Sequence, residues 1–192
     1  MDGMKGLMTS PEDRHPCGIA RRDILRLAAA ACLAIIAPGW VSCSSEPVSK
    51  VGDAPPSRIL EDLEGNPFDV PVDFRGRVVL IHFWAAWCPF CRPEMKTLEA
   101  FYQKYGKQTL IPCSINLGES REAALSYIRN LNLTYPILRD PKSTLVRPYG
   151  VSGVPTTFVL DRGGIIRFRI VGEIDRDALE GLVRTLLETG RS

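Results

Sequence analysis

The chain has 192 residues, a length that allows one domain and a leader segment. Its 24 basic and 22 acidic residues leave a formal net charge of +2, which argues against a general nucleic-acid surface because such surfaces need a basic excess. With 45% hydrophobic and 24% charged residues and no apolar run of about 18 residues, the composition fits a globular protein and excludes a disordered chain and a polytopic membrane protein.

Residues 1–42 have the order of features typical of an export signal. Three arginines within residues 21–26 come first, an unbroken apolar run over 27–37 follows, and Pro38 ends it. The run is too short to span a bilayer as an uncleaved anchor, so we expect the segment to direct export. Residues 20–26 resemble a twin-arginine signal with two departures from its usual residues, and an ordinary Sec signal is the alternative.

The residues Val41-Ser42-Cys43 resemble the end of a bacterial lipoprotein signal, in which the cysteine is lipidated and becomes the first residue. Trp40 departs from that signal, and the alternative is cleavage near Ser42 that releases a protein without lipid. Several acyl chains on Cys43 would anchor the protein stably to a membrane of the periplasm or cell envelope. Residues 43–58 are predicted to be a flexible tether that leads to a domain over 59–192.

From residue 59 onward, the apolar patterns of strands and helices alternate. Strands are predicted at 59–63 and 68–70 as an N-terminal hairpin, at 78–84, at 110–116 with a start after Pro112, at 135–138, and at 156–160 and 165–171 as a second hairpin. The continuous apolar run over 78–84 indicates a strand that is buried on both faces.

The helices have recognisable starts and stops. They are predicted from near Cys88 to Tyr105 with Gly106 as the stop, from a Ser120 cap through Leu131, as one or two turns over 144–149, and after an Asp175 cap. This order predicts an α/β fold with a central sheet flanked by helices on both faces and an antiparallel hairpin at one edge.

Cys88 and Cys91 carry the chemistry, in a Cys-Pro-Phe-Cys segment that follows the buried strand. The two intervening residues place both sulfurs within one helical turn, close enough to form a disulfide. At the start of a helix, Cys88 should ionise readily and act as the attacking thiolate. Cys91, one turn deeper and buried, can then attack a mixed disulfide at Cys88 and release the partner. We expect Trp87 to pack beside Cys88 and limit access to it.

Two other interpretations of this pair are half of a structural zinc site and an inert structural disulfide. Zinc needs about four ligands, and only Cys113 and His82 remain as candidates, so we expect no metal. A disulfide across two residues removes little chain entropy, which disfavours a purely structural bond. Cys113, within a strand, is expected to be a buried apolar residue, and a third redox thiol is its alternative.

A family resemblance follows from two segments. Residues 83–92 resemble the active-site segment of the thioredoxin superfamily, and residues 153–158 resemble its cis-proline loop. Three features make the chain resemble the TlpA/ResA-like thiol-disulfide oxidoreductases within that superfamily. They are Glu94, residues 116–120, and an extra helix and strand between Ser120 and Leu138. The resemblance implies a thioredoxin-like fold with a mixed sheet, an N-terminal hairpin and an inserted helix and strand.

The resemblance also implies roles for residues of the site. Cys88 would be the nucleophile and Cys91 the resolving thiol of a redox disulfide. Pro155, with a cis peptide bond, would stand opposite the dithiol, and Val154 would offer backbone groups to an extended substrate. Glu94 would take or give a proton near the cysteines, and a solvated Glu on the helix surface is the alternative.

Three positions bear on how far the resemblance holds. Lys96 stands where the family commonly has a proline, and Pro93 comes earlier, near the first turn of the helix, where a proline is tolerated. His82 occupies the strand position where ordinary thioredoxins carry a buried acid. We expect it to be a hydrogen-bonded core residue, and a proton relay to Cys91 is the alternative.

The expected function is an exported thiol-disulfide oxidoreductase that needs no cofactor and binds no nucleic acid. By the resemblance, it would be a reductase that serves cytochrome c maturation or copper-centre assembly. Its partners would be protein thiols and disulfides, together with a membrane-bound electron donor. The alternatives are a thiol oxidase, because the direction depends on the reduction potential, and a module that binds Cu(I) through the dithiol.

Overall fold

The computed structural model describes residues 48–189 of the chain. The predicted export signal over 1–42 and the predicted lipidation site Cys43 lie outside the described residues. Within the described part, the strands form one mixed sheet with the order β2-β1-β5-β4-β3-β6-β7. The strands are β1 (Arg58–Asp62), β2 (Pro67–Val70), β3 (Val78–Trp84), β4 (Leu110–Leu117), β5 (Ile137–Asp140), β6 (Thr156–Leu160) and β7 (Ile166–Val171).

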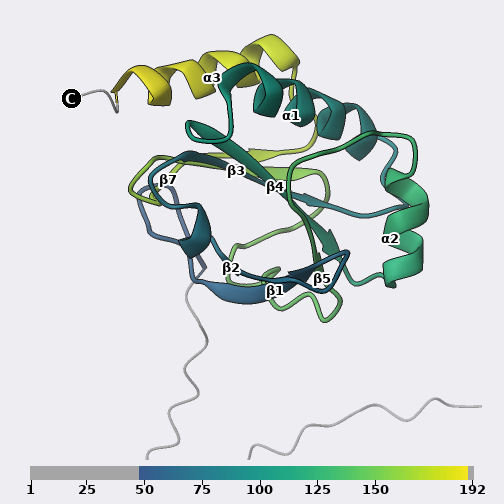
Figure 1. Ribbon diagram of the computed structural model, residues 1–192. Helices are drawn as coiled ribbons and strands as arrows, with labels where there is room; N and C mark the ends of the chain where they lie inside the picture. The colour runs from purple at the N-terminus through teal and green to yellow at the C-terminus, as the bar shows by residue number, and fades with distance from the viewer. Residues whose placement is uncertain (1–47, 190–192) are drawn as a thin grey trace, which may run out of the picture. The chain divides into compact units, whose positions relative to one another are not determined.

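The middle of the sheet is parallel and its two edges are antiparallel. Strands β3, β4 and β5 run in the same direction, whereas the β1–β2 hairpin flanks β5 and the β6–β7 hairpin flanks β3 (Figure 1). The predicted α/β class with a mixed sheet is confirmed. Both predicted hairpins lie at edges of the sheet, where only one was expected.

The helices of the described part are α1 (Cys91–Tyr105), α2 (Arg121–Ile128) and α3 (Arg176–Thr189), with a short 3-10 helix η1 (Val72–Phe74). Helices α1 and α3 lie side by side over the sheet, and α2 lies apart from them (Figure 1). Gly106 ends α1 with a φ of +77°, a backbone conformation that side chains with a Cβ disfavour. Ser120 caps α2 by accepting a hydrogen bond from the Ala123 amide, as predicted.

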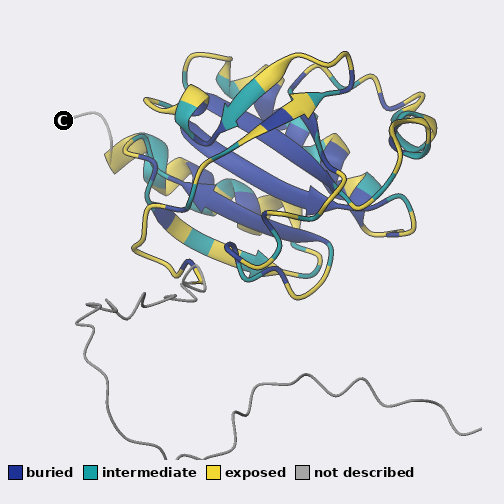
Figure 2. Ribbon diagram, turned by 90° about the horizontal axis from the view of Figure 1, so that it is seen from below, coloured by how far each residue is buried: buried dark blue, intermediate teal, exposed yellow. Residues whose placement is uncertain are grey.

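Strand β3 lies at the centre of the core, and each of its residues is buried. Its β-branched and aromatic side chains are buried on both faces of the sheet, which explains why the apolar pattern is continuous rather than alternating (Figure 2). On one face, the Phe83 ring meets the rings of Tyr149 and Phe158 edge-on, with centroids 5.4 and 5.9 Å away. The rigid strand fixes the point at which the following loop begins.

Strand β4 begins at Leu110 and includes Pro112, so the predicted start after this proline is wrong. Pro112 pairs with Leu80 of β3, but β5 pairs with β4 only from Ser114 onward. The Ser114 amide donates to Pro136 on the β5 side, and Pro112, two residues earlier, faces the same side. Its missing N–H therefore removes no hydrogen bond from the sheet.

Other boundaries also differ from the prediction. Strand β5 covers Ile137–Asp140 rather than 135–138, and α2 ends at Ile128, before Leu131. The expected helical turns over 144–149 are hydrogen-bonded turns instead, since Asp140 satisfies the amides of Thr144 and Leu145 with its carboxylate.

The second half of the predicted tether contacts the domain. The Ser49 amide donates to the carbonyl of Pro148, and the Gly52 amide donates to Ile166 at the start of β7. The Ile166 amide in turn donates to the carbonyl of Asp53. Gly52 and Asp53 thus bond to the first residue of the edge strand β7, and Ser49 bonds to a loop, contacts that the expectation of a flexible tether over 43–58 did not include.

Candidate active site

The two cysteines of the Cys-Pro-Phe-Cys segment form a disulfide, with Cα atoms 5.5 Å apart. Strand β3 ends at Trp84, a turn follows, and α1 begins at Cys91 with Phe90 as its N-cap. The helix therefore starts at the second cysteine rather than near Cys88, which lies just outside its first turn. The Cys91 amide donates to the Cys88 carbonyl over 3.4 Å across this turn.

Both sulfurs are enclosed, and two aromatic side chains stand out beside them. Cys88 and Cys91 are 1% and 0% exposed, whereas Trp87 and Phe90 are 72% and 55% exposed. Most of the Trp87 side chain therefore lies in solvent, where a partner can contact it. Exposed aromatic groups around a buried disulfide form an apolar surface at this end of the molecule.

Glu94 is buried beneath this segment rather than exposed on the helix surface. Its side chain is 4% exposed, and its Oε1 accepts a 2.5 Å hydrogen bond from the hydroxyl of Thr157 in β6. Its Oε2 has no hydrogen-bond partner. Burial raises the pKa of Glu94 to about 7, the bond from Thr157 opposes the rise, and the charge of Glu173 adds to it. The carboxyl can therefore exchange a proton near neutral pH.

A row of polar side chains crosses the sheet under α1. His82 in β3 lies between Thr157 of β6 and Ser114 of β4 in register. His82 Nδ1 and Ser114 Oγ are 3.1 Å apart, and Ser114 is hydrogen-bonded to the Tyr135 hydroxyl. Burial lowers the pKa of His82 to about 3, so the ring is neutral. This is a hydrogen-bonded core histidine, although its Nε2 has no partner.

The proline loop lies at the same edge of the sheet as the dithiol. Strand β6 begins at Thr156 opposite Phe83, so Pro155 comes next to the end of β3. The Val154–Pro155 peptide bond is cis, as the resemblance implied. The Gly172 amide donates to the Pro155 carbonyl, and the Thr156 hydroxyl donates to Gly153, so the loop is held on both sides.

Two residues that the sequence analysis did not single out hold the dithiol loop from the α2 side. Glu119 Oε2 accepts hydrogen bonds from the Ala86 amide and the Asn116 side chain. The Tyr127 hydroxyl donates to the Cys88 carbonyl over 2.8 Å. Glu119 lies within the segment used for the family resemblance, but Tyr127 carries no sequence signal because its role depends on how α2 packs.

Cys113 is fully buried in β4, and burial raises its thiol pKa far above the ordinary range. A protonated thiol of this kind is unreactive, which favours the interpretation as an apolar core residue. Among residues 48–189, no three His, Cys, Asp or Glu side chains are grouped so that they could hold a metal ion. In the same range, no helix combines the length and the apolar character needed to cross a membrane.

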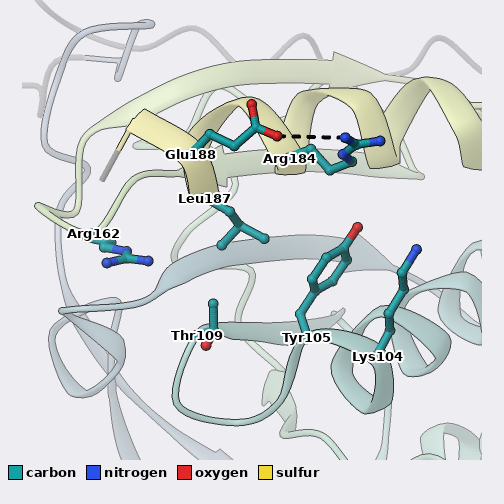
Figure 3. A pocket seen from close by; sticks show the side chains of 7 residues that line it. All are labelled: Lys104, Tyr105, Thr109, Arg162, Arg184, Leu187 and Glu188. Atoms are coloured by element: carbon teal, nitrogen blue, oxygen red, sulfur yellow. Dashed lines mark ion pairs between the residues drawn. The ribbon is translucent and has the colours of Figure 1, made fainter. Parts of the chain in front are cut away.

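A cavity of about 520 Å³ lies at the other end of α1, between the ends of α1 and α3 (Figure 3). Its lining includes three cations, but Lys104 forms an ion pair with Glu180 and Arg184 forms one with Glu188. Because Lys104 and Cys91 stand at opposite ends of the helix, this cavity is not part of the dithiol site.

Comparisons with known proteins agree with this geometry. Residues 51–169 match the model of the AhpC/TSA family. The chain is 32% identical over 130 residues to thiol-disulfide oxidoreductase ResA of Geobacillus thermodenitrificans, a match that covers 68% of this chain and 74% of that protein. It is 26% identical to sporulation thiol-disulfide oxidoreductase A of Bacillus subtilis, over 73% of this chain and 86% of that protein.

Solved structures show the same similarity. A Chlorobium tepidum protein described as a thiol:disulfide interchange protein DsbE superposes with a TM-score of 0.68 at 30% identity, over 72% of this chain and 98% of that one. The crystal structure of StoA from Bacillus subtilis gives a TM-score of 0.57 at 26% identity, over 67% and 98% of the two chains.

Proposed function

Because the chain belongs to the AhpC/TSA family of the thioredoxin superfamily and is a thiol-disulfide oxidoreductase, we propose that it is an exported reductase of specific protein disulfides. One observation carries the exchange chemistry of this proposal, in either direction: Glu94 is buried one helical turn past Cys91 and has a pKa near neutrality. Such a carboxylate can accept the proton that Cys91 must lose during the release of a reduced substrate.

The reaction begins with the reduced dithiol. The Cys88 thiolate attacks one sulfur of the substrate disulfide, which forms a mixed disulfide and frees one substrate thiolate. Cys91 then gives its proton to Glu94 and attacks Cys88, which restores the Cys88–Cys91 disulfide and frees the second substrate thiolate. The substrate gains two electrons and, with protons from Glu94 and solvent, two thiols. The protein returns to the reduced form by exchange with an electron donor in the membrane.

Substrate recognition is assigned to the apolar surface around the dithiol and to the proline loop. Trp87 would cover the substrate chain beside Cys88, and its exposed indole supports this role. Val154 and Pro155 would align an extended substrate segment, since they lie beside the end of β3. The family resemblance favours haem-site cysteines of apocytochrome c or cysteines of a copper centre as substrates.

The proposed location is outside the cytoplasm. The order of residues 1–42 supports export, and Val41-Ser42-Cys43 supports lipidation of Cys43. A lipid there would keep the dithiol near the membrane that holds its electron donor.

The first test is a trapping experiment with Cys91→Ser. Without the resolving thiol, Cys88 should remain joined to its substrates, and non-reducing gels of cells that carry the variant should show adducts that dithiothreitol removes. Cys113→Ser, which also removes one thiol, is the matched control and should trap nothing, because Cys91 is still present to resolve the mixed disulfide. Adducts with Cys88→Ser but not with Cys91→Ser would reverse the assigned roles.

The direction of electron flow is tested by the reduction potential of the Cys88–Cys91 pair against glutathione. A reductase should have a potential near that of thioredoxin, about −270 mV. A value near −120 mV, as in strong oxidants, would instead support a thiol oxidase and overturn the reductase proposal.

A further inference from the structure

The inserted helix α2 makes a direct contact with the dithiol turn through one side chain. Tyr127, in the last turn of α2, donates from its hydroxyl to the Cys88 carbonyl over 2.8 Å. The other bond to this carbonyl, from the Cys91 amide, is 3.4 Å long and correspondingly weak. The Cys88 amide donates locally to the Ala85 carbonyl over 3.1 Å, but the Cys88 carbonyl is held mainly by a residue that lies far from it in the chain.

The Tyr127 ring is itself fixed from two sides. It stacks on the Trp84 ring at the end of β3, with centroids 5.1 Å apart and planes inclined by 27°. The Arg92 guanidinium lies over the Tyr127 ring, 4.5 Å from its centroid, and donates to the Tyr127 carbonyl over 2.6 Å. Because Arg92 directly follows Cys91, these contacts join the strand before the dithiol and the helix after it to α2.

We propose that Tyr127 is a positioning residue that sets the redox properties of the Cys88–Cys91 pair through the Cys88 carbonyl. In the oxidised protein the disulfide already restrains the turn. In the reduced protein that covalent restraint is gone, and the Tyr127 hydroxyl holds Cys88 where the Cys91 sulfur can reach it. Tyr127 thereby favours closure of the disulfide and speeds the attack of Cys91 on a mixed disulfide.

This inference rests on the proposed exchange through Cys88 and Cys91. It goes beyond it because it assigns a task to the inserted helix, which contributes no reacting group. A role of Tyr127 in stability alone would stabilise the oxidised and reduced proteins equally and leave the reduction potential unchanged.

The test is Tyr127→Phe, which removes the hydroxyl but keeps the ring between Trp84 and Arg92. In equilibrium with glutathione, the protein disulfide and two glutathione thiols give the protein dithiol and one glutathione disulfide. The constant for closing the protein disulfide should fall about three- to tenfold, which raises the reduction potential by about 14 to 30 mV.

The rate of the resolving step gives a second readout. Reduced protein attacks 5,5′-dithiobis(2-nitrobenzoate) through Cys88 and releases one thionitrobenzoate. Cys91 then closes the protein disulfide and releases the second one. Tyr127→Phe should slow the second release about three- to tenfold and change the first release little.

Tyr105→Phe is the matched control. Tyr105 lies at the end of α1 far from the dithiol, and its hydroxyl donates to Glu180 of α3. Removal of this hydroxyl should change neither readout. Arg92→Lys, which keeps the charge but loses the planar donor, should shift both readouts in the same direction as Tyr127→Phe.

Unchanged potential and unchanged second release in Tyr127→Phe, with an active wild type, would overturn this inference alone. A wild-type protein that exchanges with neither reagent would overturn the proposed function instead. Melting temperatures of both redox forms show whether the variant is folded, and if it is not, Arg92→Lys carries the test.

Discussion

Glu94 combines two properties that an exposed helix residue does not have. Its carboxyl is almost completely buried, and only one of its oxygens has a hydrogen-bond partner. An unpartnered buried oxygen disfavours the charged form, which is why the pKa rises from 4.5 to about 7. The burial that suits Glu94 to proton transfer therefore also lowers the free energy of unfolding above neutral pH.

This linkage can be measured with Glu94→Gln in the oxidised protein. The folded state retains a proton that the unfolded state releases from about pH 4.5, so the stability that Glu94 contributes is full below that pH and is lost as the pH rises to 7. Relative to wild type, the variant should gain about 2 to 3 kcal/mol in free energy of unfolding between pH 5 and pH 8. Urea unfolding at both pH values checks this.

His82 titrates with the opposite sign, since its pKa is lowered and its contribution to stability is lost as the pH falls below 6.5. Because His82 is present in both proteins, its contribution cancels in the difference between them. A difference between variant and wild type that does not change from pH 5 to pH 8 would show that Glu94 ionises freely in the folded protein. Proton transfer by Glu94 would then lose its physical basis.

At the scale of single elements, Asp140 organises the loop that joins β5 to β6. Its carboxylate accepts hydrogen bonds from the amides of Thr144 and Leu145 and from the Thr144 hydroxyl, and the residue is 1% exposed. These bonds replace the backbone bonds that a helix over this loop would have made. The loop then delivers Leu145 and Tyr149 into the core.

Asp140→Ala should lower the free energy of unfolding by about 2 to 4 kcal/mol, because it leaves the buried Leu145 amide and the part-buried Thr144 amide without their acceptor. Chemical denaturation at pH 7 gives this number. Asp177→Ala, at an exposed aspartate in the first turn of α3, is the comparison and should change stability by less than about 1 kcal/mol. Equal effects of the two variants would mean that Asp140 does not organise the loop.

The elements with strong local signals were predictable. Strand β6 and the cap of α2 agree with the prediction because an apolar run, a hairpin turn and a Ser cap determine them locally. The start of β4 was not predictable. Pro112 is tolerated within the strand only because β5 pairs with β4 from Ser114 onward, two residues after the proline. Of the site, the cysteines and Pro155 follow from motifs, whereas the contact of Tyr127 depends on long-range packing.

At the scale of the whole molecule, lipidation of Cys43 would attach the protein to a membrane. If Cys43 carries a lipid, the protein should sediment with membranes and partition into detergent, and Cys43→Ala should abolish both properties. Mass spectrometry of the mature N-terminus checks the modification directly. A mature protein that begins after Cys43 without acyl mass would contradict the anchor.

The hydrogen bonds that residues 49–53 make to the domain have a consequence for such an anchor. Ser49 is already hydrogen-bonded to the domain, so only six peptide units separate the domain from Cys43. Fully extended, this tether spans at most about 20 Å. That length is shorter than the diameter of a domain of this size. A lipid-anchored protein would therefore stay next to the bilayer surface and could not move far from it. Substrates would have to reach the membrane surface, and a longer tether would increase the distance from the membrane at which the dithiol can react with them.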